Sequence, residues 1–175
     1  MKTKQNLIGL ALLAVGMFLP QLTNAQNLKI QNSNIKISGT STMHDWDMSA
    51  KATTFTGVVN GNTITNVKFV VPAKNLKSTK GSMMDSKAAK ALKDADITFA
   101  ANTINIGKSN VTGQLTIAGV TKNITLPVNV VKKGDVYVIT GDEGIKMSDY
   151  KMDRPGMIGM KAGDDVKVNV TIEAK

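Results

Sequence analysis

The sequence predicts an all-β fold, a closed antiparallel β-barrel with one short α-helix. Apolar and polar residues alternate with a period of two through many short segments, as in strands with one buried face. The dipeptide Asn60-Gly61 stands between two such segments and is a strong signal for a tight hairpin. About eight or nine strands of this kind suit a barrel, because closure leaves no unpaired edge. A β-sandwich is the alternative architecture.

The clearest strand lies close to the C-terminus, where Val166, Val168, Val170 and Ile172 alternate with polar residues. We expect these side chains to face the interior and the residues between them to face solvent. The same kind of alternation predicts the other strands, at residues 35–38, 43–48, 54–59, 63–71, 97–99, 111–117, 124–130 and 136–140.

Some positions depart from this regular pattern. Pro127 has no N–H to give to a ladder, so it marks an edge or a bulge. Residues 147–150 are predicted to form a further polar-faced strand before the last hairpin. The acidic pairs at 142–143 and 164–165 adjoin glycines, which is typical of solvated turns.

Residues 82–93 are predicted to form the helix, since they hold good helix formers and no Gly, Pro or β-branched residue. Ser82 or Asp85 would cap its start. The apolar residues follow helical spacing and form one stripe, made of Met84, Ala88, Ala91 and Leu92. The solvent-facing side would hold three lysines, Lys87, Lys90 and Lys93.

Residues 1–25 have the layout of a secretory signal peptide, with early lysines, an apolar run and short residues before a cleavage position after Ala25. The apolar run of about 13 residues is shorter than the ~18–20 that span a bilayer. We therefore expect residues 26–175 to form one exported domain, periplasmic or secreted, with no membrane span. No disulfide can form, because the chain has no cysteine.

The residue types on which enzymes depend are scarce. His44 is the only histidine, and the sequence has no thiol, phosphate-binding loop, calcium loop or dinucleotide-binding motif. A Ser-His-Asp triad would have to use His44. We therefore expect no enzyme activity, no cofactor and no metal site. The net charge of +9 would suit nucleic acid, but export and an aromatic content of 4% argue against that partner.

His44 and Trp46 fall on one face of the strand predicted at 43–48, with Asp45 and Asp47 on the other. This face is either a packed wall of the core, with the indole N–H bonded to a neighbour, or the wall of a ligand cavity. A packed wall is the simpler interpretation of Trp46. For His44 the two interpretations are equally open.

The segment from residue 147 to residue 160 is rich in methionine, with Met147, Met152, Met157 and Met160. Methionine side chains are flexible and polarisable, so they fill gaps in a core or mould to variable ligands. Thioethers also bind Cu(I). Gap filling, ligand contact and copper binding are therefore three separate interpretations of this segment.

Lysines at 74, 77, 80, 87, 90 and 93 form a basic cluster with one acid among them, Asp85. Such a run is usually a solvated face. If it borders a cavity mouth, its potential would attract anionic head groups.

Several short motifs, in their order and spacing, resemble the YceI-like family over nearly all of residues 26–175. The matching residues are Ser41, His44 and Trp46, then Met84-Asp85 and residues 91–93, residues 97–99, residues 113–122, Asp149-Tyr150 and residues 163–166. One departure is Ala95-Asp96, which stands where family members often carry an aromatic-Pro pair, so we expect a differently built turn there.

The resemblance implies a lipocalin-like barrel that binds a polyisoprenoid or a similar long-chain lipid in an apolar cavity and catalyses no reaction. The ligand would then contact His44, Trp46, Phe69, Phe99, Leu115, Met147, Tyr150, Met152, Met157 and Met160. Its head group would lie near Lys87 and Lys90. A homodimer is left open. The competing hypotheses are a methionine-based Cu(I)-binding protein and a structural or interaction module without a ligand.

Overall fold

The computed structural model describes residues 25–157 and 160–175, and within them the chain forms a closed eight-stranded antiparallel barrel. Closure follows from the pairing of the last long strand with the first. The predicted all-β barrel with one short helix is confirmed. The predicted signal peptide, apart from Ala25, lies outside the described residues.

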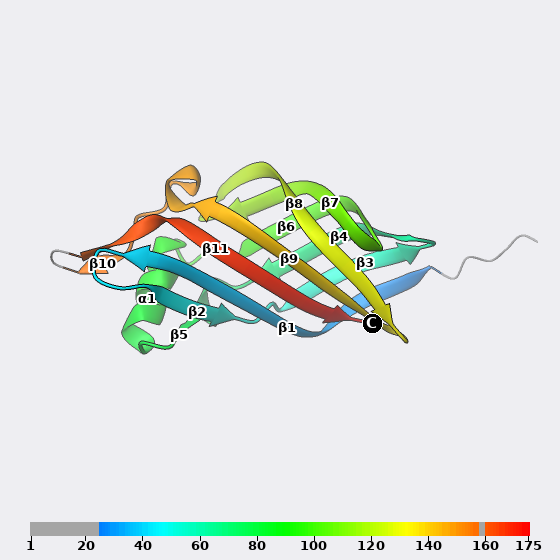
Figure 1. Ribbon diagram of the computed structural model, residues 1–175, viewed down its shortest axis with the longest axis horizontal. Helices are drawn as coiled ribbons and strands as arrows, with labels where there is room; N and C mark the ends of the chain where they lie inside the picture. Colours follow the sequence, from blue (N-terminus) through cyan, green and yellow to red (C-terminus); the bar gives the residue numbers. More distant parts are fainter. Residues whose placement is uncertain (1–24, 158–159) are drawn as a thin grey trace, which may run out of the picture.

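The strands are β1 (Gln26–Ser41), β2 (Trp46–Ala50), β3 (Thr54–Asn60), β4 (Thr63–Val71), β5 (Lys77–Ser78), β6 (Ile97–Asn105), β7 (Gly107–Ile117), β8 (Val120–Lys133), β9 (Val136–Lys146), β10 (Gly156–Met157) and β11 (Met160–Ala174). The helices are α1 (Ser82–Ala91) and the short 3-10 helices η1 (Ala73–Asn75) and η2 (Met147–Tyr150). The barrel wall runs in the order β1, β3, β4, β6, β7, β8, β9, β11 and back to β1. The short strands β2, β5 and β10 lie toward the end of the barrel at which α1 packs (Figure 1).

The alternation in β11 has the predicted facing. Val166, Val168, Val170 and Ile172 line the interior, whereas Asn169 is exposed. The hairpin at Asn60-Gly61 is also confirmed, since it joins β3 to β4 and Gly61 has a φ of 57°. Glycine adopts this left-handed conformation without the steric cost that a side chain would add.

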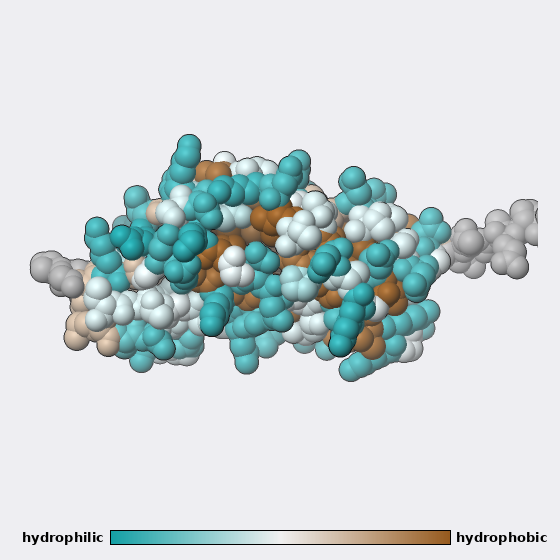
Figure 2. All heavy atoms as spheres, turned by 45° about the horizontal axis from the view of Figure 1, so that its top comes forward, coloured by the Kyte–Doolittle hydropathy of each residue, from teal (hydrophilic) through white to brown (hydrophobic). Residues whose placement is uncertain are grey.

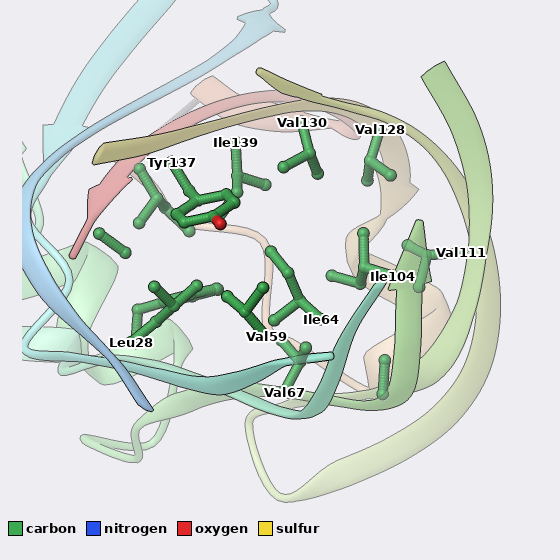
Figure 3. Close-up of a cluster of buried hydrophobic side chains, with 14 residues drawn as sticks. Leu28, Val59, Ile64, Val67, Ile104, Val111, Val128, Val130, Tyr137 and Ile139 are labelled. Atoms are coloured by element: carbon green, nitrogen blue, oxygen red, sulfur yellow. The ribbon is translucent and has the colours of Figure 1, made fainter. Parts of the chain in front are cut away.

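One half of the barrel interior, next to the C-terminus, is packed solid. Leu28, Ile64 and Val130 are each less than 2% exposed. Figure 3 shows the side chains of this cluster pointing inward from strands around the barrel. We call this region the packed half. It is defined by the residues that lie in this cluster and do not line the cavity described below, namely Leu28, Val59, Ile64, Ala101, Val130, Tyr137 and Ala174.

The helix α1 covers the opposite end, and the predicted stripe of Met84, Ala88, Ala91 and Leu92 faces the barrel interior. The predicted side-chain cap is wrong, because Gly81 precedes the helix and no side chain caps it. Asp85 instead accepts a hydrogen bond from the Ser78 N–H at 2.7 Å and pairs with Lys77 at 3.3 Å. The Ser78 N–H holds the pKa of the Asp85 carboxyl below its usual value.

Two further predictions about local structure are wrong. Residues 147–150 form η2 and not a strand, and the acidic pairs at 142–143 and 164–165 lie inside β9 and β11 and not in turns. Asp164 accepts hydrogen bonds from the Ser148 N–H at 2.8 Å and the Ser148 hydroxyl at 2.6 Å. These bonds hold the tight turn of η2 against β11, which is why the chain does not continue there as a strand.

Candidate ligand cavity

The half of the barrel nearest α1 holds an apolar cavity of about 550 Å³. This volume falls within the range of roughly 300–1,000 Å³ that is usual for small-molecule sites. Every strand of the barrel wall contributes inward-facing side chains to it. We call this region the hollow half. Many of its lining residues are only half-buried, among them Phe69, Phe99, Leu115, Val168 and Val170.

Two aromatic side chains of this wall lie against glycines of neighbouring strands. A Cβ at Gly39 would collide with the Trp46 ring, and a Cβ at Gly113 would lie 2.5 Å from Cζ of Phe99. The glycines therefore leave room for both rings against the backbone of the next strand. Trp46 also donates its indole N–H to the Thr40 carbonyl at 2.8 Å, and both Trp46 and Phe99 line the cavity.

His44 lies in an exposed turn before β2, so the strand predicted at 43–48 starts too early. The Ser41 hydroxyl holds this turn, since it donates to the His44 carbonyl at 2.6 Å and accepts from the His44 N–H at 3.2 Å. These bonds replace the strand ladder here. The His44 ring Nδ1 lies 2.9 Å from the Asp45 carbonyl, and His44 contributes to the cavity lining at its mouth.

The methionines of residues 147–160 have different positions. Met147 is 4% exposed and packs with Ala162 and Val166, and it lines the cavity together with Met152 and Met160. The side chain of Met157 lies outside what the structure describes. No group of three or more His, Cys, Asp or Glu residues within the described residues is placed to hold a metal ion.

Tyr150 does not line the cavity. It is 2% exposed and belongs to a buried cluster that also holds Ile35, Met48 and Leu92, which do line the cavity. Burial raises the pKa of its phenol, and the charges of Asp149 and Glu143 raise it further.

The basic cluster lies only partly at the cavity. Lys80 and Lys87 line the cavity mouth, together with Lys161 of β11, whereas Lys90 is exposed and does not line it. Lys87 donates its Nζ to the Gly156 carbonyl at 2.9 Å, which joins α1 to β10. Lys87 therefore lies beside the cavity, whereas Lys90 does not.

Sequence reasoning missed Glu143, which faces the cavity from β9. Burial among apolar groups raises the pKa of its carboxyl. The sequence did carry a signal, because Glu143 is an even number of residues from Ile139 and Ile145 and so shares their face of the strand, and both isoleucines line the cavity. The glycines on either side of the Asp142-Glu143 pair hid that signal, because they favoured a turn.

A closed antiparallel barrel that surrounds an apolar cavity, with a short helix across one end, has the architecture of a lipocalin-like barrel. Its sequence also matches a family model, that of the YceI-like domain, over residues 27–174. The chain therefore belongs to the YceI-like family, and the resemblance drawn from its motifs is confirmed.

Solved structures share this fold at low sequence identity. A polyisoprenoid-binding domain from Saccharophagus degradans aligns with a TM-score of 0.68 and 12% identity, covering 85% of this chain and 97% of that one. BcnA of Burkholderia cenocepacia aligns with a TM-score of 0.59 and 20% identity, covering 82% and 96%. The YceI protein of Campylobacter jejuni aligns with a TM-score of 0.51 and 22% identity, covering 98% and 97%.

No curated protein matches the sequence. Within the described residues, no helix has the length and apolar character needed to cross a membrane.

Proposed function

We propose that this protein is exported to the periplasm or secreted, and that it holds a long-chain amphiphile, a polyisoprenoid or similar lipid, in the hollow half of the barrel. The observation that carries the proposal is the apolar cavity of about 550 Å³ inside a barrel whose other half is packed solid. The membership of the YceI-like family and the likeness of the fold to a polyisoprenoid-binding domain support it.

The chemistry of the lining suits a hydrocarbon chain. Trp46, Phe69, Phe99 and Leu115 offer apolar surface, and burial of each CH₂ group contributes about 0.8 kcal/mol. Methionines at the α1 end, Met147, Met152 and Met160, can adjust their side chains to chains of different shape. Most of the described residues that line the cavity are apolar, and we propose binding without catalysis.

At the α1 end, the polar groups of the mouth would receive the head group. His44 and Lys87 line this mouth. Lys90 adds positive charge from the exposed face of α1 and would act only at longer range. An anionic head group therefore fits this mouth best.

Mass spectrometry of an organic extract of the purified protein tests the proposal. We expect a long-chain lipid in about equimolar amount, because a single cavity of this volume holds one chain. Metal analysis of the same preparation tests the competing hypothesis that the protein binds Cu(I). Bound copper without lipid would contradict the proposal, and so would an empty protein that takes up no geranylgeraniol in a titration.

A further inference from the structure

The ladder between β8 and β9 ends part of the way along the two strands. It runs from Lys133↔Val136 to Val128↔Gly141 and has no pair beyond that point in the described residues. There β8 remains paired with β7, and β9 remains paired with β11. Pro127 is the first unpaired position of β8 on this side, so the edge that its missing N–H predicted is found here.

A short ladder does not by itself make an opening. The ladder between β6 and β7 has only three pairs, from Thr98↔Thr116 to Ala100↔Gln114. Beyond them, Ile104 and Val111 are 3% and 2% exposed, so packed side chains close that part of the wall.

Unlike Ile104 and Val111, the side chains that border the gap between β8 and β9 are not fully buried. Ile124 and Leu126 of β8 and Glu143 and Ile145 of β9 all line the cavity, and all are half-buried. Figure 2 shows apolar atoms at the surface along the face over which β8 runs, bordered by hydrophilic ones. We call this gap the flank opening and define it by these four residues.

An ion pair spans the wide end of the flank opening. Lys122 Nζ of β8 lies 2.9 Å from Asp149 Oδ1 in η2 and 5.7 Å from the centre of the Tyr150 ring. This ion pair and the Val128–Gly141 pair, the last of the ladder, thus form two ends of its rim.

Glu143 is the polar group of this rim. Its carboxyl has no hydrogen bond or ion pair with residues 25–157 and 160–175. Lys122 pairs with Asp149 and not with Glu143. The Glu143 side chain is only half-buried and still reaches solvent, so a ligand hydroxyl group would replace water as the hydrogen-bonding partner of this carboxyl. The negative charge of the Glu143 carboxylate makes this opening unfavourable for an anion.

We propose that the flank opening binds the polar end of an uncharged long-chain alcohol, with the Glu143 carboxyl hydrogen-bonded to its hydroxyl group. This inference rests on the proposed function of the same cavity. The cavity then has two mouths of different chemistry. The mouth beside Lys80, Lys87 and Lys161 suits an anionic head group, and the flank opening suits an uncharged one.

The test compares geranylgeraniol with geranylgeranyl diphosphate in titrations of the wild-type protein, Glu143→Leu and Glu143→Gln. We expect Glu143→Leu to weaken binding of the alcohol about tenfold, as loss of one hydrogen bond to a polar group does. Glu143→Gln keeps a hydrogen-bonding group and should stay within about threefold of wild type. Neither change should weaken binding of the diphosphate.

A Glu143→Leu protein that binds the alcohol as tightly as wild type would overturn the inference. An equal loss for both ligands would also overturn it, because the effect would then not concern the hydroxyl group. If the wild-type protein bound neither ligand, the result would instead contradict the proposed function, on which the inference rests.

Thiol labelling tests the location independently, because the chain has no cysteine of its own. Leu126→Cys places a thiol on the rim, and Asn123→Cys places one on the exposed outer face of the same strand. We expect geranylgeraniol to slow the reaction of a water-soluble maleimide at position 126 at least fivefold and to leave position 123 unchanged. Equal rates at position 126 with and without the alcohol would overturn the inference.

Discussion

The packed half and the hollow half of the barrel are built from the same strands and the same alternation, yet they differ in what fills them. In the packed half, Leu28, Ile64 and Val130 touch neighbours on every side and are less than 2% exposed. In the hollow half, Phe69 and Leu115 face empty space and remain half-buried. The ladder between β8 and β9 persists only up to Val128 and is lost beside the cavity. The comparison indicates that the hollow half gives up side-chain packing to keep its volume.

The largest expected effect concerns stability. Ile64→Ala should lower the free energy of unfolding by about 2–5 kcal/mol, because it opens a cavity in a close-packed core. Leu115→Ala should cost about half as much or less, since its side chain already borders a cavity and has fewer neighbours to lose. Urea unfolding of both variants and the wild type measures the difference. Equal losses at the two positions would mean that the hollow half is packed in solution.

A smaller effect concerns pH at the η2 end of the hollow half. The hydroxyl and the N–H of Ser148 hold the pKa of Asp164 below its ordinary value. A carboxyl whose folded pKa is lowered adds stability above its unfolded pKa of about 3.9, and that stability is lost as the pH falls through the folded pKa. Asp164→Asn should therefore be less stable than wild type at pH 6, and the difference should shrink below about pH 4.

Urea midpoints of the two proteins across this pH range measure that prediction. Ile64→Ala serves as the control, because its loss of packing involves no titrating group and should not depend on pH in the same way. A difference between wild type and Asp164→Asn that stayed constant into acid would contradict the role assigned to the Asp164 carboxylate.

The parts of the fold that follow from local chemistry could be predicted from the sequence. The facing of Val168 follows from a period of two, and the α1 stripe around Met84 follows from helical spacing. The hairpin at Asn60-Gly61 follows from turn chemistry.

Features that depend on a distant partner could not be predicted. The position of Glu143 was hidden by adjacent glycines, because local sequence favours a turn wherever glycine and acids meet. The bond from Lys87 to Gly156 joins residues far apart in the chain. The flank opening has almost no signal, since Ile124 and Leu126 alternate as in any paired strand, and Pro127 alone indicates an edge.

Fluorescence of Trp46 tests the central claim most directly, because it is the only tryptophan in the chain and it lines the cavity. A long-chain alcohol brominated on its hydrocarbon part should quench this fluorescence with saturation at about one ligand per protein, as expected for a single cavity of this size. The same alcohol without bromine should restore the emission by competition. Quenching that rises without saturation and resists competition would mean that the chain does not enter the hollow half, and it would contradict the account.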